Sequence, residues 1–415
     1  MRTTVSGLPY HCWNVKSLAR RSHRSRSPIP YFMKRKNKPS FINAAMKILF
    51  VHQGAELYGS DRTFEQSVRG YRNNHPEAHI SVLLASHGPL QELLNQSVDE
   101  LAVEPLFVLR KQLIKSGKLF NPVSLARAVR RARKRIAGFD AVYINTTVII
   151  DYIVACRLSR VPSIVHVHEL PSGLTRTILR AILGFSKAEV IYNSRATQNA
   201  FGFGTRTTHH VVYNGTVIEN PIEPEISGPL KILMIGRFNS WKGQGLLVEA
   251  LALAAERNGV KVEVKMAGGV YKDQYHFKEA VVSSVQQNNL RQVVEFVEFI
   301  PDPSELYRWS NLVVVPSLLP EPFGLVAIEA MGHKRAVIGA SHGGLAEIIQ
   351  DGNSGSLFTP GSKDALAEAI LRYHEQPELL RSHGAAGYQR YLDCFHEDRY
   401  MKGITEVIER VKQAA

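Results

Sequence analysis

The sequence predicts an α/β protein with two doubly wound domains, each built around a parallel sheet. From Met46 onward, short apolar segments alternate with amphipathic helical patterns, as is typical of parallel β-α-β units. The alternation breaks at residues 220–229, where three prolines and a glycine interrupt it. A second alternating half follows, and 415 residues are enough for two domains that each bury a core.

The first half, residues 46–222, is expected to form one Rossmann-like domain. Residues 47–51, Lys-Ile-Leu-Phe-Val, are expected to form a short buried strand, and a helix is expected to begin near Asp61. The other strands expected in this half are 79–84, 141–145, 163–168, 190–192 and 211–213.

The second half, residues 223–394, is expected to form a similar domain. Its strands are expected at residues 230–235, 262–267, 293–296, 312–315, 336–338 and 356–358. Residues 395–415 are expected to form a helix that packs back toward the N-terminal domain. No Gly-x-Gly-x-x-Gly fingerprint occurs, which weakens a dehydrogenase interpretation.

Composition and charge favour a cytoplasmic globular enzyme. Hydrophobic residues make up 44% and charged residues 21% of the chain, both ordinary values, and no apolar run reaches the ~20 residues that span a bilayer. Three distant cysteines predict no disulfide framework. The net charge of +14 is concentrated in residues 1–45 and 105–139, which hold ten basic residues each and no acidic residue.

Residues 1–45 are expected to be a disordered basic extension, because they lack apolar periodicity. Their Arg- and Ser-rich composition also resembles a transit peptide. The preferred interpretation is that the natural start lies at Met46 or Met33, which mass spectrometry of the native N-terminus would decide.

The most informative motif is a pair of glutamates that lie eight positions apart. Glu321 stands in a loop after an apolar strand, and Glu329 is expected about two turns into a helix. A helix start offers unpaired N–H groups and partial positive charge, which suit an anion. The amides at this start belong to Phe323, Gly324 and Leu325. Because carboxylates accept hydrogen bonds from sugar hydroxyls, the pattern predicts a nucleotide-sugar site.

Two cations follow the first strand of the second half directly. Arg237 and Lys242 belong to the loop 236–243, Gly-Arg-Phe-Asn-Ser-Trp-Lys-Gly, which is expected at the ligand-binding end of the sheet. Arg237 offers a planar fork and Lys242 a mobile point charge, and both suit a diphosphate. Alone, Arg237 and Lys242 are weak evidence for a diphosphate site, but in combination with the two glutamates the evidence becomes strong.

Together these residues resemble glycosyltransferase family 4, whose members are retaining enzymes of the GT-B fold, with two Rossmann-like domains facing across a cleft. The resemblance rests on Gly-Arg…Lys-Gly at 236–243 and on Glu-x7-Glu at Glu321 and Glu329, and it covers roughly residues 46–410. Supporting marks are Met266-Ala267-Gly268-Gly269, Pro316-Ser317, Gly343-Gly344 with Glu347, and Tyr213-Asn214-Gly215.

The resemblance implies a hexosyltransferase-type enzyme that moves a sugar from a nucleotide-diphosphate-sugar to a glycan or lipid-linked acceptor, in cell-envelope polysaccharide or glycolipid synthesis. Arg237 and Lys242 would hold the donor diphosphate, and Glu329 the ribose hydroxyls. The groups implied to meet the sugar and the distal phosphate are Glu321 and the amides of Phe323, Gly324 and Leu325.

The first half is expected to hold the acceptor and to complete the reaction centre. Gly59 and Ser60, between the first strand and the first helix, are candidates for phosphate contacts. Similar enzymes have a glycine-rich loop here, but in this chain Tyr58 replaces the first of two glycines and Asp61 replaces a common glutamate. Asp61 is at least as well explained as a helix cap or first-turn acid as by catalysis.

Strand ends of the first half supply three further candidates. His168 ends a buried strand where similar enzymes carry a histidine beside the transferred sugar, and alternation places His166 on the same face as a structural residue. Asn145 and Asn193 follow other strands, and each is either a cleft residue or a turn residue that satisfies its own backbone.

The family's chemistry is often explained by same-face attack, in which the leaving phosphate takes the acceptor's proton. No protein base is then needed, and Glu321 is the candidate nucleophile for a double displacement. No Asp-x-Asp triplet occurs, so neither a metal nor a cofactor is expected. Glu298 stands near a position where the family usually has glycine, beside the nucleobase, which leaves the choice of nucleotide open.

A basic helix is expected at residues 123–136. Leu125, Val129, Ala132 and Ile136 recur every three to four residues and would form its buried stripe. The arginines and lysine between them form either an ordinary solvated face or a surface for anionic lipid on the inner face of the cytoplasmic membrane. Nucleic acid is not expected as a partner, because no aromatic-interleaved binding motif accompanies the charge.

Two alternatives from other classes stay open. One is a GT-B-fold phosphorylase or epimerase acting on sugar nucleotides, of which the cation and Glu-x7-Glu set disfavours the epimerase. The other is a non-catalytic membrane-associated scaffold of the same fold, against which the intact Arg237, Lys242, Glu321 and Glu329 argue.

Overall fold

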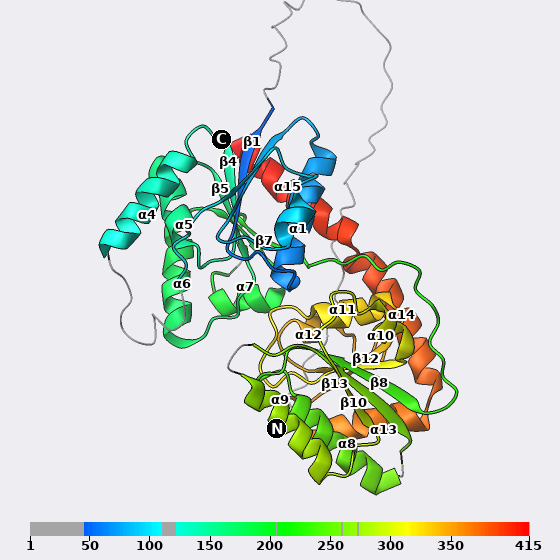
Figure 1. Ribbon diagram of the computed structural model, residues 1–415. Helices are drawn as coiled ribbons and strands as arrows, with labels where there is room; N and C mark the ends of the chain where they lie inside the picture. Colours follow the sequence, from blue (N-terminus) through cyan, green and yellow to red (C-terminus); the bar gives the residue numbers. More distant parts are fainter. Residues whose placement is uncertain (1–44, 110–121, 205, 259, 272–273, 415) are drawn as a thin grey trace, which may run out of the picture. The chain divides into compact units, whose positions relative to one another are not determined.

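Two parallel sheets organise the chain (Figure 1). The computed structural model describes residues 45–109, 122–204, 206–258, 260–271 and 274–414. The first sheet has seven strands in the order β3-β2-β1-β4-β5-β6-β7. Their bounds are β1 Lys47–His52, β2 His79–Leu84, β3 Glu100–Val103, β4 Ala141–Asn145, β5 Ser163–Val167, β6 Glu189–Tyr192 and β7 His209–Val211.

The second sheet has six strands in the order β10-β9-β8-β11-β12-β13, and all its strand pairs are parallel. Their bounds are β8 Leu230–Ile235, β9 Val262–Ala267, β10 Val294–Val297, β11 Leu312–Val315, β12 Ala336–Ala340 and β13 Ser356–Phe358. The predicted pair of doubly wound, Rossmann-like domains is confirmed.

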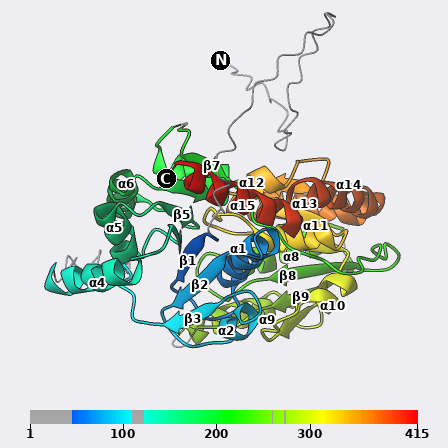
Figure 2. The same cartoon turned by 90° about the horizontal axis from the view of Figure 1, so that it is seen from above.

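Alternation along β1 explains how helices cover both faces of the first sheet. Ile48 and Phe50 pack into a cluster with α1, α2 and α15, whereas Leu49 and Val51 pack into a cluster with α4, α5, α6 and α7. Figures 1 and 2 show α1 and α15 on one side of the sheet and α4, α5 and α6 on the other. The helices are α1 Gly59–Asn74, α2 Leu90–Leu94, α4 Pro122–Arg135, α5 Ile150–Ser159, α6 Gly173–Ser186, α7 Arg195–Phe201 and α15 Glu397–Ala414.

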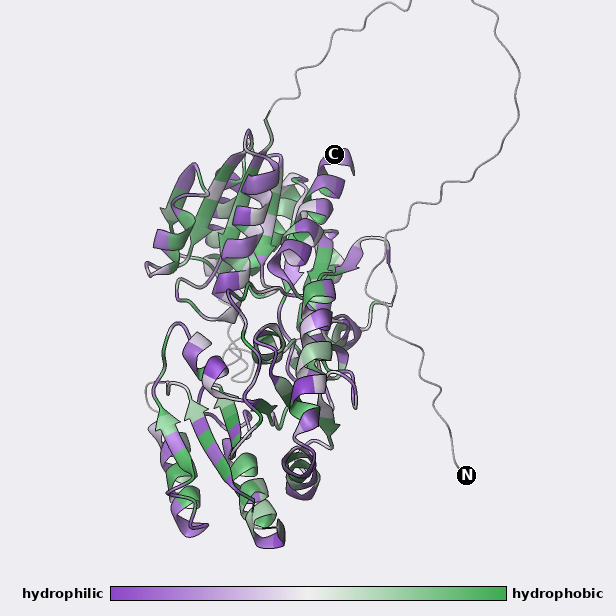
Figure 3. Cartoon of the chain, turned by 90° about the vertical axis from the view of Figure 1, so that its right-hand side faces the viewer, coloured by the Kyte–Doolittle hydropathy of each residue, from purple (hydrophilic) through white to green (hydrophobic). Residues whose placement is uncertain are grey.

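The second sheet is covered in the same way. Leu230, Ile232 and Met234 of β8 pack with α8, α9 and α13, and α11, α12 and α14 pack against β12. The strands are mostly hydrophobic in Figure 3, while the helices also carry hydrophilic turns. The bounds are α8 Gln244–Asn258, α9 Tyr275–Gln287, α10 Ser304–Trp309, α11 Leu325–Gly332, α12 Leu345–Ile348, α13 Lys363–Glu375 and α14 Glu378–Cys394.

Each sheet has a switch point, which is a pair of neighbouring strands from which the chain continues toward opposite edges of the sheet. In the first sheet β1 and β4 are neighbours, and the helices that follow them, α1 and α5, lie on opposite faces. In the second sheet β8 and β11 are neighbours in the same way. Ligands of open α/β sheets bind beyond the carboxyl ends of such strands. The loops after these four strands are therefore where a site is expected.

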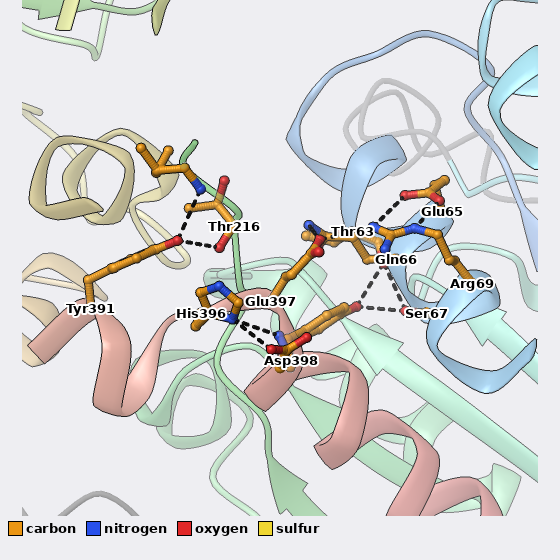
Figure 4. A network of polar contacts seen from close by, with 12 residues as sticks. Thr63, Glu65, Gln66, Ser67, Arg69, Thr216, Tyr391, His396, Glu397 and Asp398 are labelled. Carbon is orange, nitrogen blue, oxygen red and sulfur yellow. Dashed lines mark hydrogen bonds and ion pairs between the residues drawn. The ribbon is translucent and has the colours of Figure 1, made fainter. Parts of the chain in front are cut away.

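The C-terminal helices connect the two domains. Helix α14 packs on the second domain, and the hydroxyl of Tyr391 near its end donates to the carbonyl of Thr216 at 2.9 Å. Helix α15 then packs on α1 of the first domain, where Arg69 pairs with Glu397 at 2.9 Å (Figure 4). The chain thus returns to the N-terminal domain through a junction that polar contacts hold on both sides.

A second link between the domains is made by Glu347 of α12. Its carboxylate accepts from the backbone N–H groups of Arg195 at 2.9 Å and Ala196 at 2.6 Å, in the first turn of α7. A carboxylate at a helix N-terminus is favoured by the unpaired N–H groups and the helix dipole there. The hydroxyl of Ser194 also donates to the carbonyl of Pro322 at 2.6 Å, beside the loop of the predicted site.

Every predicted strand lies within two residues of an observed one. Strand β3 was not predicted, and β7 lies two residues earlier than the predicted 211–213. The predicted extension at 1–45 lies outside the described residues, apart from Ala45. Within the described ranges, no helix is both long enough and apolar enough to cross a membrane.

Candidate active site

The loops that follow β1 and β8 meet at the switch points. Tyr58 precedes α1, and its ring lies 4.5 Å from the guanidinium carbon of Arg237 in the loop after β8. A Cβ on Gly59 would lie 2.5 Å from the side chain of Leu325, the first residue of α11. Predicted site residues of both domains therefore come together here.

Lys242 and Glu321 form an ion pair in the predicted site. The ammonium of Lys242 lies 2.7 Å from Oε1 of Glu321, which is 7% exposed. The hydroxyl of Ser317 donates to the same oxygen at 2.5 Å. An ammonium has three donors, so Lys242 can hold Glu321 with one and a ligand oxygen with another.

Side-chain hydrogen bonds and a close backbone contact fix the loop that carries Lys242. Asn239 Oδ1 accepts from the backbone N–H groups of Trp241 at 3.0 Å and Lys242 at 2.9 Å, the pattern of an Asx turn. Gly243 has φ +84°, and a Cβ there would lie 2.0 Å from the carbonyl oxygen of Pro316. Only glycine fits this position, so the loops after β8 and β11 approach closely.

Arg237 lies between two tyrosine rings. Its guanidinium carbon is 3.6 Å from the ring centroid of Tyr271 and 4.5 Å from that of Tyr58. Both tyrosines are exposed, and such stacking orients a guanidinium while leaving its donors at the edge of the plane. The departure from glycine at Tyr58 thus gives Arg237 an aromatic neighbour from the other domain.

The start of α11 is shaped by glycines. Gly324 precedes the helix with φ +131°, a conformation that L side chains rarely adopt. A Cβ on Gly343 would lie 2.4 Å from the carbonyl oxygen of Glu321, and one on Gly344 would lie 2.2 Å from that of Phe323. The two glycines let the loop after β12 support the loop that carries Glu321. Phe323 is buried, and its ring contacts those of Tyr213 and Phe395.

Glu329 lies about one turn into α11, and the expected two turns were wrong because the helix begins only at Leu325. The hydroxyl of the buried Tyr307 donates to Glu329 Oε2 at 2.7 Å. Burial raises the pKa of Glu329, and the hydrogen bond from Tyr307 opposes this rise. The hydrogen bond from Tyr307 thus fixes the position of the Glu329 carboxyl.

If the Glu329 carboxylate holds ribose hydroxyls, as the family resemblance implies, its raised pKa makes nucleotide binding depend on pH. As the pH falls, Glu329 takes up a proton at a higher pH than an ordinary carboxyl, and a protonated carboxyl is a weaker acceptor for ribose hydroxyls. Affinity for a nucleoside diphosphate should therefore weaken from that pH downward. Calorimetry of the parent and of Glu329→Gln across pH checks this, and a parallel decline in both would assign the effect to the phosphates.

His168 and Asn145, both predicted site residues, are hydrogen-bonded. His168 Nε2 lies 2.8 Å from Asn145 Oδ1. Asn145 Nδ2 in turn lies 2.9 Å from Nδ1 of the buried His52, whose Nε2 is 2.7 Å from Asp61 Oδ1. The ring centroids of His166 and His168 lie 4.0 Å apart with the rings tilted, and His166 Nδ1 lies 2.6 Å from the hydroxyl oxygen of Tyr143. His166 is a fully buried core residue, as expected from the sequence.

The end of β4 is strained. Thr146, which follows Asn145, has φ +126°, an outlier for a β-branched residue. The hydroxyls of Thr146 and Thr147 both donate to the carboxylate of Glu169, which directly follows His168. Asn193 is 2% exposed, and its Oδ1 has no hydrogen-bond partner among the described residues. The structure places Asn193 below the surface, at the end of β6.

Two residues singled out in the sequence, Glu298 and Ser60, have exposed side chains. Glu298 is exposed and forms an ion pair with Lys278, so its side chain points to solvent. Ser60 is exposed beside Gly59, at the start of α1. Three partners of predicted residues were not predicted from the sequence: His52, Tyr307 and Tyr271. Only His52, at the end of a predicted strand, carried a positional signal for the site.

Residues 218–390, somewhat less than half of the chain, match the family model of glycosyl transferases group 1. An alpha-maltose-1-phosphate synthase from Mycolicibacterium smegmatis is 30% identical over 49% of this chain and 57% of its own length. The lipopolysaccharide core biosynthesis mannosyltransferase LpcC from Rhizobium leguminosarum bv. viciae is 28% identical over 51% of this chain and 62% of its own. The chain thus covers less than two thirds of either relative.

Solved structures match over a longer stretch. The structure of Anabaena Alr3699/HepE in complex with UDP has a TM-score of 0.72 and 25% identity, over 89% of this chain and 100% of that one. The chain has the GT-B fold. The UDP-glucose complex of the same Anabaena protein matches with a TM-score of 0.72 and 26% identity, over 88% of this chain. These likenesses support a GT-B glycosyltransferase.

Proposed function

We propose that this chain is a retaining glycosyltransferase of family 4 that moves a sugar from a nucleotide-diphosphate-sugar to a glycan or lipid-linked acceptor, in cell-envelope polysaccharide or glycolipid synthesis. The observation that carries the proposal is the pairing of Lys242 with Glu321 beside the start of α11. This arrangement brings a cation, a carboxylate and free helix amides to the switch point of one sheet.

The residues have distinct roles in the proposed reaction. The bond between the anomeric carbon and the diphosphate breaks, and negative charge grows on the leaving oxygen. Lys242, Arg237 and the amides at Gly324 and Leu325 stabilise this charge, because preorganised donors need no reorganisation during the reaction. The acceptor oxygen forms the new bond on the same face, and its proton passes to the leaving phosphate.

His168 and Glu329 act on the bound donor rather than on the breaking bond. Glu329, held by Tyr307, accepts from the ribose hydroxyls, and His168 lies beside the transferred sugar. No step needs a metal ion, and metal independence is part of this proposal. UDP and UDP-glucose are bound by the Anabaena relative, which makes uridine nucleotides the first donors to try.

The test is release of nucleoside diphosphate from a panel of sugar nucleotides without acceptor. A ligand at a hundred times its dissociation constant stabilises the folded chain by ~2.7 kcal/mol, so thermal shifts select the donor first. Slow hydrolysis of the stabilising donor supports a transferase, and added glycan or lipid acceptors should accelerate it. Stabilisation without any release favours the non-catalytic scaffold, and cleavage that depends on inorganic phosphate favours a phosphorylase.

We also propose that the chain binds peripherally to the inner face of the cytoplasmic membrane through α4. Val129 and Ala132 of this helix are buried and Leu125 packs against the same cluster, as the predicted stripe requires. Arg127, Arg130 and Lys134 are exposed on the rest of the surface. Basic residues near an anionic bilayer contribute about 1 kcal/mol each.

Replacing Arg127, Arg130 and Lys134 with glutamine is expected to weaken binding to vesicles of mixed neutral and anionic lipid roughly a hundredfold, since about 3 kcal/mol is lost. Sedimentation measures the effect. The matched control replaces Lys261, Arg291 and Arg381, which are exposed on the second domain, and it should bind like the parent. Equal binding of the parent to neutral and anionic vesicles would remove the membrane role.

A further inference from the structure

A line of four polar side chains crosses the N-terminal domain from α1 to the end of β5. Asp61 Oδ1 lies 2.7 Å from His52 Nε2, His52 Nδ1 lies 2.9 Å from Asn145 Nδ2, and Asn145 Oδ1 lies 2.8 Å from His168 Nε2. Asp61, His52 and Asn145 are each 4% exposed or less. We call these four side chains the relay. Each imidazole nitrogen donates or accepts according to the tautomer of its ring, and the Asn145 amide can take two orientations.

Backbone groups at two points fix the direction of these hydrogen bonds. Asn145 Nδ2 also lies 3.4 Å from the carbonyl oxygen of Ser60, which can only accept, so the amide nitrogen faces both Ser60 and His52. His52 Nδ1 must then accept, and its proton sits on Nε2 and points to Asp61. At the far end, the N–H of Tyr58, which can only donate, reaches Asp61 Oδ2 at 3.0 Å. The carboxylate of Asp61 therefore receives both donors.

The tautomer of His168 follows from its partner in the same way. Asn145 Oδ1 can only accept, so His168 carries a proton on Nε2. Burial lowers the pKa of His168 to about 3, so the ring is neutral. A neutral ring with its proton on Nε2 has a lone pair on Nδ1. His168 thus offers an acceptor, not a donor, at its remaining nitrogen.

The approach of Asp61 to His52 is built into the backbone. A Cβ on Gly54 would lie 2.1 Å from Asp61 Oδ1 and 2.9 Å from His52 Nε2, so any larger residue would push between them. The ring of His52 is also stacked on that of Phe64, with centroids 4.6 Å apart. These packing contacts hold the two side chains in one arrangement.

We propose that His52 and Asp61 are positioning residues, which act through Asn145 to hold His168 in the tautomer that accepts a hydrogen bond from a hydroxyl of a bound sugar. The sugar rests on the proposed glycosyltransferase function, whereas the direction of the relay does not. Asp61 is thus more than a helix cap, although its contact with the Tyr58 N–H does cap α1.

The direction of the relay can be read in the unliganded protein. Two-bond proton–nitrogen correlation spectra of the full chain labelled with nitrogen-15 in histidine distinguish protonated from unprotonated ring nitrogens. Comparison with His52→Gln and His168→Gln assigns the signals. We expect both His52 and His168 to carry the proton on Nε2. A proton on Nδ1 of either ring overturns the proposal, whether or not any sugar nucleotide is turned over.

The variant Asp61→Asn tests whether the two ends of the relay, Asp61 and His168, are coupled. Asparagine has one acceptor oxygen, and the N–H of Tyr58 and the N–H of His52 both need it. When the oxygen faces Tyr58, the amide nitrogen faces His52 Nε2, so His52 must move its proton to Nδ1. That proton then opposes Asn145 Nδ2, and rotation of the Asn145 amide would transfer the reversal to His168. We expect the signals of both histidines to change tautomer in this variant.

A measurement of kcat separates the positioning role of Asp61 from a general effect of the substitution on stability. With the donor found by thermal shift, Asp61→Asn should lower kcat roughly tenfold or more, as expected when a hydrogen bond to a substrate hydroxyl is lost. Ser362→Ala is the matched control, since it removes the cap of α13, far from the relay, at a similar cost in stability, and kcat should stay within about twofold. Unchanged histidine tautomers together with an unchanged kcat in Asp61→Asn contradict the proposal.

Discussion

Replacing Lys242 with alanine is expected to lower kcat with the preferred sugar nucleotide at least about a hundredfold. A single preorganised donor to a developing anion is worth ~3 kcal/mol in the transition state, which corresponds to that factor. Lys242 lies 2.7 Å from Glu321, next to the start of α11, so its charge is placed where the proposed leaving group would lie. Steady-state release of nucleoside diphosphate measures the loss.

Loss of the ion pair must be separated from loss of catalysis. Lys242→Ala leaves the carboxylate of Glu321 buried with Ser317 as its remaining partner, and a buried charge that loses its partner destabilises the fold. The double variant Lys242→Met with Glu321→Gln removes both charges at similar volume. It should recover much of the melting temperature but none of the activity.

A surface lysine provides the second control. Lys231 pairs with the exposed Glu225 at 3.1 Å, and such pairs contribute little. Lys231→Ala should therefore leave kcat and the melting temperature near those of the parent. If Lys242→Ala retained activity within tenfold of the parent while the fold stayed intact, Lys242 would have no role in stabilising the diphosphate.

The sheets could be predicted from the sequence because their central strands, such as β4, β5, β11 and β12, are buried on both faces. Residues 48–51 of β1 are all apolar and inaccessible, so hydrophobicity alone reveals them. Strand β3, Glu100–Val103, is a short edge strand whose residues are exposed or half-buried, and so it gave no such signal. The edge strand β7 is likewise half-buried, and its position was displaced toward the more apolar residues that follow.

The site was predicted as a set of residues but not as a set of contacts. Lys242 and Glu321 were recognised separately, and their ion pair depends on the close approach of the loops at Gly243 and Pro316. Tyr307 and Tyr271 come from other segments, and no local pattern links them to Glu329 or Arg237. Partners distant in sequence are brought together by the topology of the sheet, which a single sequence does not encode locally.

Replacing Glu329 with glutamine is expected to remove most of the preference for ribose over deoxyribose in the nucleotide. In the parent the carboxylate accepts from Tyr307 with Oε2 and can accept from ribose hydroxyls as well. In the variant the amide oxygen is needed by Tyr307, so its nitrogen faces the ribose and cannot accept. Charge-assisted hydrogen bonds contribute about 1.5–3 kcal/mol, so binding of a ribonucleoside diphosphate should weaken roughly ten- to hundredfold.

Binding of a deoxynucleotide distinguishes the loss of the hydrogen bond between Glu329 and ribose from general damage to the pocket. A 2′-deoxy or 3′-deoxy nucleoside diphosphate lacks a hydroxyl that Glu329 could hold, so parent and variant should bind at least one of them with nearly equal affinity in calorimetry. Tyr307→Phe is the matched variant, since it keeps the carboxylate but removes the donor at 2.7 Å, and it should retain a preference for ribose. If Glu329→Gln discriminated between ribose and deoxyribose as strongly as the parent, the sugar of the nucleotide would lie elsewhere. The carboxylate of Glu329 would then serve only to hold Tyr307 and α10 in place.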